Sequence, residues 1–174
     1  GSATERAANG ATDNAALQQR AVQGDAAAQF ELGSAMADGL GMPRDYKRAA
    51  EWLRAAAVQG HAGAQAGLGY AYAGALGVPR NLPTSVLWYQ RAADQGNALG
   101  QTYLGFAYAT GQGVHADQQQ AAVLFRKAAV QGYAPAQANL GVMLMLGQGT
   151  PKNLAEALVW FQKAATRHNA TAQY

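Results

Sequence analysis

Residues 128–132 read AAVQG, and the same Ala-Ala-x-Gln-Gly pattern stands at residues 56–60 and 92–96. The Gln-Gly pair alone also occurs at Gln23-Gly24, so successive pairs lie 36 residues apart, as from Gln59 to Gln95. A Leu-Gly pair keeps the same step, at Leu32, Leu68, Leu104 and Leu140. A period of this length, held without an insertion over four copies, is typical of a repeat protein built from stacked supersecondary units.

Each copy predicts two amphipathic helices joined by a glycine-containing loop. The first, helix A, runs roughly from Ala26 to Ala37 in the first copy and ends at a loop such as Gly39-Leu40-Gly41-Met42-Pro43. Glycine permits a left-handed C-terminal turn and proline stops the helix. The second, helix B, runs from the loop to the Gln-Gly pair. Residues suited to capping precede helix A at Asp25, Asn97 and Asn169 and helix B at Asp45, Asn81, Asp117 and Asn153.

Every helix A carries an internal glycine, at Gly33, Gly69, Gly105 and Gly141. Such a glycine costs about 1 kcal/mol relative to alanine in an exposed helix, so we expect a packing reason for it. The absence of a Cβ would let helix B lie close against the helix A backbone. We therefore interpret the large pairs of helix B as core residues; they are Trp52-Leu53, Trp88-Tyr89, Leu124-Phe125 and Trp160-Phe161.

Residues 98–105 read ALGQTYLG, residues 111–114 read GQGV and residues 127–132 read KAAVQG. Together they resemble the pattern A-x-x-Q-x-x-L-G…G-x-G-V-P…K/R-A-A-x-Q-G of the Sel-one-like repeat family, which is related to tetratricopeptide repeats. The resemblance covers residues 21–168. It implies an all-α fold, a right-handed superhelical α/α solenoid of four full 36-residue helix-turn-helix repeats with partial helices at both ends.

The length of 174 residues fits one domain. We expect a cloning scar and flexible tail at residues 1–12, an N-terminal capping helix at 13–24, repeats at 25–60, 61–96, 97–132 and 133–168, and the start of a truncated helix at 169–174. Three departures from the family pattern stand out: His115 replaces the loop proline, Leu124 replaces the tryptophan of helix B, and Arg167-His168 replaces Gln-Gly. The natural protein is expected to extend beyond Tyr174.

The resemblance also predicts a binding surface, because helix A lines the inner, concave wall in tetratricopeptide folds. The helix A positions that we place on this wall vary between copies, whereas the packing positions do not, and such variation on a constant frame is typical of a partner-binding groove. They are Phe30, Ser34, Asp38, Tyr70, Thr102, Phe106, Thr110, Val142, Met145 and Leu146. Their apolar and aromatic character favours a peptide or an amphipathic helix. The alternative is that they pack against each other or against a missing terminal helix.

We expect no enzyme, cofactor, metal or small-molecule substrate. The chain has no cysteine, and His61, His115 and His168 fall at three different repeat positions, so they form no column. His61 is expected to replace a helix cap, His115 a loop proline and His168 a helix-ending glycine. The Gly-x-Gly loops follow a helix and lack a following Lys-Ser/Thr, so they are turns and not phosphate-binding loops.

Binding of nucleic acid is a weaker alternative. Two repeat positions carry basic residues, Arg91, Lys127 and Lys163 at one and Arg44, Arg80 and Lys152 at the other. Such residues usually form a solvated face, and the net charge is only +3. No apolar run reaches the roughly 20 residues that span a bilayer.

A protein or peptide partner is therefore expected, with the oligomeric state left open. We favour a bacterial adaptor or scaffold. The alternative is an immunity protein that neutralises a secreted toxic effector, such as a lipase, delivered by a neighbouring cell. We favour the periplasm over the cytoplasm, on the expectation that a signal sequence has been removed ahead of Gly1.

Overall fold

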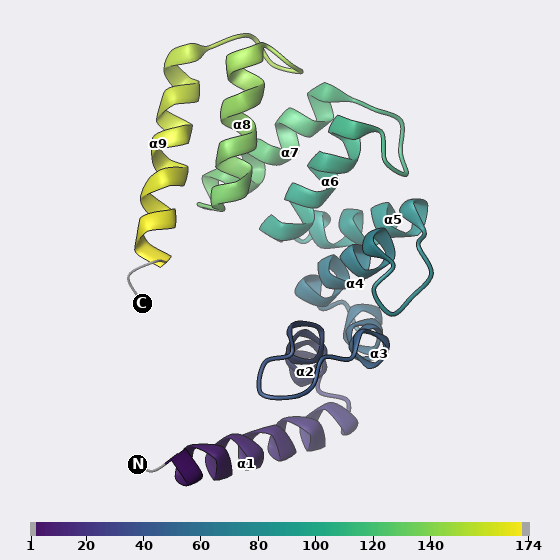
Figure 1. The fold of residues 1–174 in the computed structure, drawn as a ribbon. Helices are drawn as coiled ribbons and strands as arrows, with labels where there is room; N and C mark the ends of the chain where they lie inside the picture. Colours follow the sequence, from purple (N-terminus) through teal and green to yellow (C-terminus); the bar gives the residue numbers. More distant parts are fainter. Residues whose placement is uncertain (1–2, 172–174) are drawn as a thin grey trace. The chain divides into compact units, whose positions relative to one another are not determined.

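The fold consists of α-helices joined by short loops (Figure 1). In the computed structural model the backbone is described for residues 3–171 and the side chains for residues 13–166. Within residues 3–171 the helices are α1 (Ala3–Val22), α2 (Ala26–Asp38), α3 (Tyr46–Val58), α4 (Ala62–Gly74), α5 (Leu82–Asp94), α6 (Ala98–Thr110), α7 (Gln118–Val130), α8 (Ala134–Leu146) and α9 (Leu154–Thr171). Helices α2, α4, α6 and α8 are the predicted A helices, and α3, α5, α7 and α9 are the B helices. The all-α helical repeat architecture is confirmed.

The chain divides into two compact units after Asn81. Unit 1 contains α1 to α4 and unit 2 contains α5 to α9. We had expected one domain. In a repeat protein each repeat packs only against its neighbours, so a division can fall between the two helices of one repeat, here between α4 and α5 of the second.

Most predicted caps are formed by side chains. In front of the A helices, Asp25, His61 and Asn97 accept hydrogen bonds from backbone N–H groups of the first turn, at 3.1, 3.1 and 2.8 Å. His61 does so through Nδ1, as expected for a substitute cap. In front of the B helices, Asp45, Asp117 and Asn153 accept equivalent bonds at 3.0 Å, and Asn81 immediately precedes α5.

The predictions for both ends of the chain differ from the structure. Helix α1 begins at Ala3, within the predicted tail of residues 1–12, because that stretch is rich in alanine, the best helix former. At the other end no new helix starts at residue 169, since α9 continues to Thr171. The side chain of Asn169, which we expected to be a cap, lies outside the described ones. His168 stands where the other repeats place a left-handed glycine such as Gly60 (φ 95°), so nothing ends the helix. Residues 172–174 lie outside the described part.

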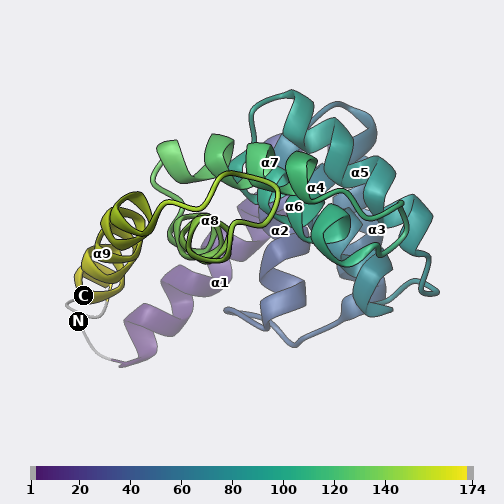
Figure 2. The same ribbon diagram turned by 90° about the horizontal axis from the view of Figure 1, so that it is seen from above.

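The internal glycines of helix A pack closely, as predicted. A methyl group on Gly33 would lie 3.0 Å from Leu53 Cγ, and one on Gly105 would lie 3.0 Å from the Phe125 ring. In the last repeat a methyl group on Gly141 would approach the Phe161 ring to 2.7 Å. Helices α8 and α9 accordingly lie side by side in both views (Figures 1 and 2).

The recurring glutamines join neighbouring helices. Gln29, Gln65 and Gln137 are buried, and their side-chain amides donate to backbone carbonyls of the preceding B helix or of α1, at 3.1, 3.2 and 3.1 Å. The glutamine of the Gln-Gly pair adds a second bond, as from Gln59 Nε2 to Gln29 Oε1 at 2.7 Å. Buried amides need such partners, so both repeated glutamines serve the fold.

Candidate partner-binding surface

One position of each A helix faces solvent with a large apolar side chain in three of the four repeats. Tyr70, Phe106 and Val142 stand 36 residues apart and are 49%, 39% and 39% exposed. Ser34 occupies this position in the first repeat and is half-buried. An exposed apolar side chain at one repeated position is not explained by the core of either unit.

A second set of predicted residues lies one turn further along each helix. Asp38 and Thr110 are exposed, and the Thr110 hydroxyl donates to the Phe106 carbonyl at 2.7 Å. On α8 the equivalent residue is Leu146, which is 55% exposed, beside Met145. Together with Val142 these two residues form an apolar surface on α8, which we call the α8 patch.

One predicted residue is buried, and another is half-buried against a neighbouring ring. Thr102 is 2% exposed, and its hydroxyl donates to the Ala98 carbonyl at 2.7 Å, so its assignment to the inner wall is wrong. Phe30 is half-buried and stacks on His61 with 4.6 Å between ring centroids. Both residues share a repeat position with the fully buried Ala66 and the half-buried Ala138, so exposure at this position differs between repeats.

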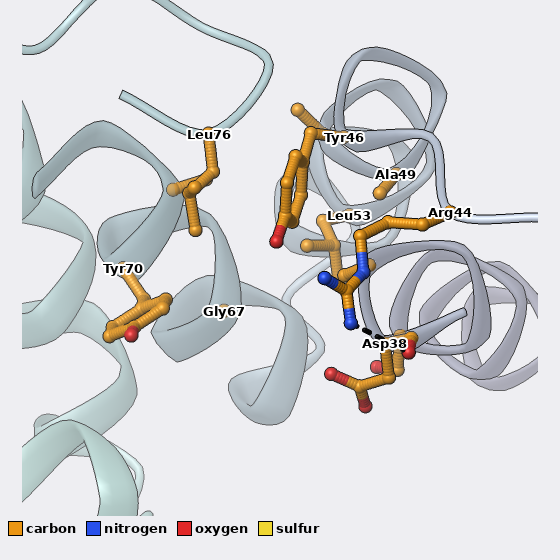
Figure 3. Close-up of a pocket in the computed structure, with 12 residues that line it drawn as sticks. Asp38, Arg44, Tyr46, Ala49, Leu53, Gly67, Tyr70 and Leu76 are labelled. Atoms are coloured by element: carbon orange, nitrogen blue, oxygen red, sulfur yellow. Dashed lines mark hydrogen bonds between the residues drawn. The ribbon is translucent and has the colours of Figure 1, made fainter. Parts of the chain in front are cut away.

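Unit 1 contains a pocket of about 370 Å³ between α2, α3 and α4 (Figure 3). Three predicted surface residues line it, namely Ser34, Asp38 and Tyr70. Sequence analysis missed the remaining wall, which Arg44 and Tyr46 form with Leu76. These three stand in loops or at the start of α3, outside the helix A positions that we considered.

Arg44 is the basic group of this pocket. Its guanidinium donates to the Asp38 carbonyl at 3.2 Å and lies 5.7 Å from the centroid of the Tyr46 ring. The ion pairs found among the described side chains are Arg20–Asp25 and Arg126–Glu156, so no described carboxylate neutralises Arg44. The guanidinium therefore keeps donors for an acidic group.

The described charged side chains of unit 2 lie on the B helices, except for Asp117 and Lys152 in the loops. Arg126 pairs with Glu156 at 2.6 Å, and Trp160 Nε1 donates to the same carboxylate at 3.1 Å. Both contacts, that from Arg126 first, hold the pKa of Glu156 below its ordinary value. Arg91 and Lys163, from the predicted basic column, lie over Trp88 and Trp160 at 4.6 and 4.5 Å from the ring centroids. These cations thus have aromatic partners on their own helices.

Neither a metal site nor a membrane span emerges from the described residues. Among their side chains no three of histidine, aspartate and glutamate gather as metal ligands would. No helix in this part of the chain combines the length and the apolar character needed to cross a bilayer.

The four repeats match a known repeat family. The family described as Sel1 repeat matches residues 26–61, 62–97, 98–133 and 134–169, each one residue later than the predicted limits. This chain belongs to the Sel1 repeat family. Sel1 repeat proteins are generally protein-interaction modules, and their fold is typically a non-catalytic scaffold. The comparison with curated proteins finds no match.

Solved Sel1 repeat structures resemble this one closely. A protective antigen of uropathogenic Escherichia coli strains with an SLR fold is 36% identical, with a TM-score of 0.81 over 88% of this chain and 33% of that one. A Sel1 repeat protein from Oxalobacter formigenes is 33% identical, with a TM-score of 0.83 over 91% of this chain and 63% of that one. This chain therefore spans less than two thirds of either relative. The Helicobacter pylori cysteine rich protein B, at 20% identity and a TM-score of 0.59, shares the fold alone over 71% of this chain and 92% of that one.

Proposed function

We propose that this Sel1 repeat protein is a binding module that holds a peptide or an amphipathic helix of a partner protein against its A helices, in the concave groove that the solenoid architecture predicts. The observation that carries the proposal is the exposure of Tyr70, Phe106 and Val142 at one repeated position. Unit 1 contributes Tyr70 with Ser34 and Asp38, and unit 2 contributes Phe106, Thr110 and the α8 patch.

Exposed side chains of this kind support a binding role because interfaces concentrate aromatic and methionine residues at their centres. A few such anchors usually supply most of the binding free energy. The α8 patch of Val142, Met145 and Leu146 is entirely apolar, which suits the apolar face of a helix.

Within this proposal we favour an adaptor or scaffold in a bacterial cell, located in the periplasm and without catalytic activity. The alternative remains an immunity protein that neutralises a secreted toxic effector such as a lipase. The gene neighbourhood separates them, since an adjacent effector gene supports immunity and adjacent sensor or secretion genes support an adaptor. Co-elution of the purified chain with the product of the adjacent gene then provides the partner for the following test.

The test compares two double variants in isothermal titration against that partner. Tyr70→Ser with Val142→Ser removes two exposed anchors from the A helices. Val58→Ser with Val130→Ser removes two valines that are 68% and 67% exposed on B helices, and serves as the control. We expect the first variant to bind at least about tenfold more weakly, the loss that one buried anchor of about 1.4 kcal/mol gives, and the control to bind normally. Equal affinities of the two variants would overturn the proposal.

A further inference from the structure

The pocket of unit 1 exists because three repeat positions carry smaller side chains there than in the later repeats. Ser34, Leu53 and Gly67 all line it. At the same positions the later repeats have larger residues: Tyr70, Phe106 and Val142 in place of Ser34, Tyr89, Phe125 and Phe161 in place of Leu53, and Tyr103 and Asn139 in place of Gly67. The pocket is therefore a local feature of unit 1 and not a property of the repeat.

In unit 2 aromatic rings stand at the repeat positions of Ser34, Leu53 and Gly67, and these rings pack against each other. Phe106 packs edge-on against Phe125, with 5.2 Å between the ring centroids. Tyr103 stacks on Tyr89 at the same distance. In unit 1 neither Leu53 nor Gly67 brings a ring, and about 370 Å³ stays open. The repeat's own packing therefore indicates an aromatic ring as the group that fits.

The walls of the pocket favour the same group. Figure 3 shows Leu76 facing Tyr46 across the pocket, Leu53 next to Tyr46, and Tyr70 on the same helix as Gly67. Tyrosine rings in the wall can receive an inserted ring edge-on or offset, the arrangements that aromatic pairs prefer.

The edge of the pocket carries the positive charge of Arg44, which an inserted aromatic ring would leave without an acidic partner. The Arg44 guanidinium reaches from this edge to the Asp38 carbonyl, and no described carboxylate pairs with it. Arginine presents several N–H donors in a plane, which suits a carboxylate. The Asp38 carboxylate also stands at the edge, so an incoming acid is best placed on the side of Arg44 that faces away from this carboxylate.

We propose that this pocket binds the aromatic side chain of a partner peptide whose next residue is acidic, with the ring over Leu53 and Gly67 and the carboxylate on Arg44. The inference rests on the proposed binding function and names the chemistry that unit 1 selects. An aromatic residue followed by aspartate or glutamate is the recognition element.

Three capped dipeptides test the two halves of this element by NMR titration of the ¹⁵N-labelled full chain. Acetyl-Phe-Asp-amide should shift the backbone amides of Gly67 and Leu76 and bind about tenfold more tightly than acetyl-Ala-Asp-amide. Acetyl-Phe-Asp-amide should also bind about threefold more tightly than acetyl-Phe-Asn-amide, because only the acid can pair with Arg44. Arg44→Gln should remove this preference for Asp over Asn and leave the preference for Phe over Ala unchanged. Asp38→Asn should strengthen the preference for the acid. Shifts confined to residues outside the pocket, or equal binding of the Phe and Ala probes, would overturn the inference.

A variant that fills the pocket with a side chain tests whether the probe binds there. Gly67→Tyr installs the residue that stands at the equivalent position as Tyr103, and its Cβ would meet Leu53 at an ordinary 3.4 Å. We expect it to abolish the acetyl-Phe-Asp-amide shifts. Gly67→Ala, which adds only a methyl group, is the matched control for helix propensity and should still bind.

The two proposals fail separately. If the partner protein binds Gly67→Tyr as tightly as the unchanged chain but loses affinity for Tyr70→Ser with Val142→Ser, the pocket inference is wrong and the binding function stands. If the Phe-Asp probe binds as expected while the double variant keeps full affinity for the partner, the pocket inference stands and the proposed surface is wrong.

Discussion

The first and third repeats use the same contact and differ in what surrounds it. In unit 1 Gly33 of α2 faces Leu53, and in unit 2 Gly105 of α6 faces Phe125; a Cβ on either glycine would lie 3.0 Å from the opposing side chain. Phe125 is 2% exposed and is covered by Phe106, whereas Leu53 borders the open pocket. The repeat therefore needs a close glycine contact and tolerates large differences of volume beside it.

Truncation of the two facing residues should separate the repeats most clearly. We expect Phe125→Ala to lower the free energy of unfolding by about 3–5 kcal/mol, since it leaves a closed cavity. Leu53→Ala should cost about 2–3 kcal/mol, because part of its surroundings is already open. Urea unfolding followed by circular dichroism measures both. If Leu53→Ala costs as much as Phe125→Ala, the pocket of unit 1 is closed in solution and the comparison fails.

The ends of the A helices differ in a second way. The left-handed residue after the helix is Ala75 at the end of α4 (φ 56°) and Gly111 at the end of α6 (φ 70°), at equivalent positions. Alanine in this conformation costs about 1–2 kcal/mol, whereas glycine adopts it freely. We expect Ala75→Gly to stabilise the chain by about 0.5–1 kcal/mol, after the greater freedom of glycine in the unfolded chain is subtracted, and Gly111→Ala to destabilise it by about 1–2 kcal/mol.

Thermal unfolding of both variants decides this point. The control is Ala16→Gly at an exposed position inside α1, which should cost about 1 kcal/mol because the helix interior disfavours glycine. A loss of stability in Ala75→Gly, like that of the control, would show that the left-handed cap carries no strain.

Residue periodicity predicted the helices well and the exposure of side chains only in part. The 36-residue step, the glycine loops and caps such as Asp25 and Asn97 act locally, so their consequences can be read from spacing. Exposure depends on the neighbouring helix as well. Thr102 was placed on the surface from its position in helix A, but packing buries it.

The pocket was missed for a related reason. It results from volumes that are absent at Ser34, Leu53 and Gly67, and these residues lie on three different helices. A sequence pattern that records which residues recur does not show that three positions with comparatively small side chains meet. Aligning the four copies by position and comparing side-chain volumes would have indicated it.

The smallest expected difference concerns the two ion pairs. Arg20 and Asp25 of unit 1 pair at 2.7 Å, and their side chains are 55% and 37% exposed. Arg126 and Glu156 of unit 2 pair at 2.6 Å and are 43% and 33% exposed. The Trp160 side chain also donates to Glu156 at 3.1 Å, whereas the second donor to Asp25 is the backbone N–H of Ala28, also at 3.1 Å. The pKa of each carboxyl is lowered, first by the hydrogen bond from its arginine. A lowered pKa means that the folded state prefers the ionised carboxyl, so its contribution is complete above the unfolded pKa of about 4 and is lost as pH falls through the folded-state pKa.

Urea midpoints measured from pH 7 to pH 3 should therefore fall less steeply at the acid end for Glu156→Gln than for the unchanged chain. We expect the Glu156 contribution to be below about 1 kcal/mol, because a third of the side chain is exposed to screening solvent. Asp25→Asn, which retains a side-chain oxygen able to cap α2, should flatten the same profile less. A larger flattening from Asp25→Asn would mean that the Trp160 bond adds nothing to the pair, and that unit 1 holds the stronger of the two carboxylates.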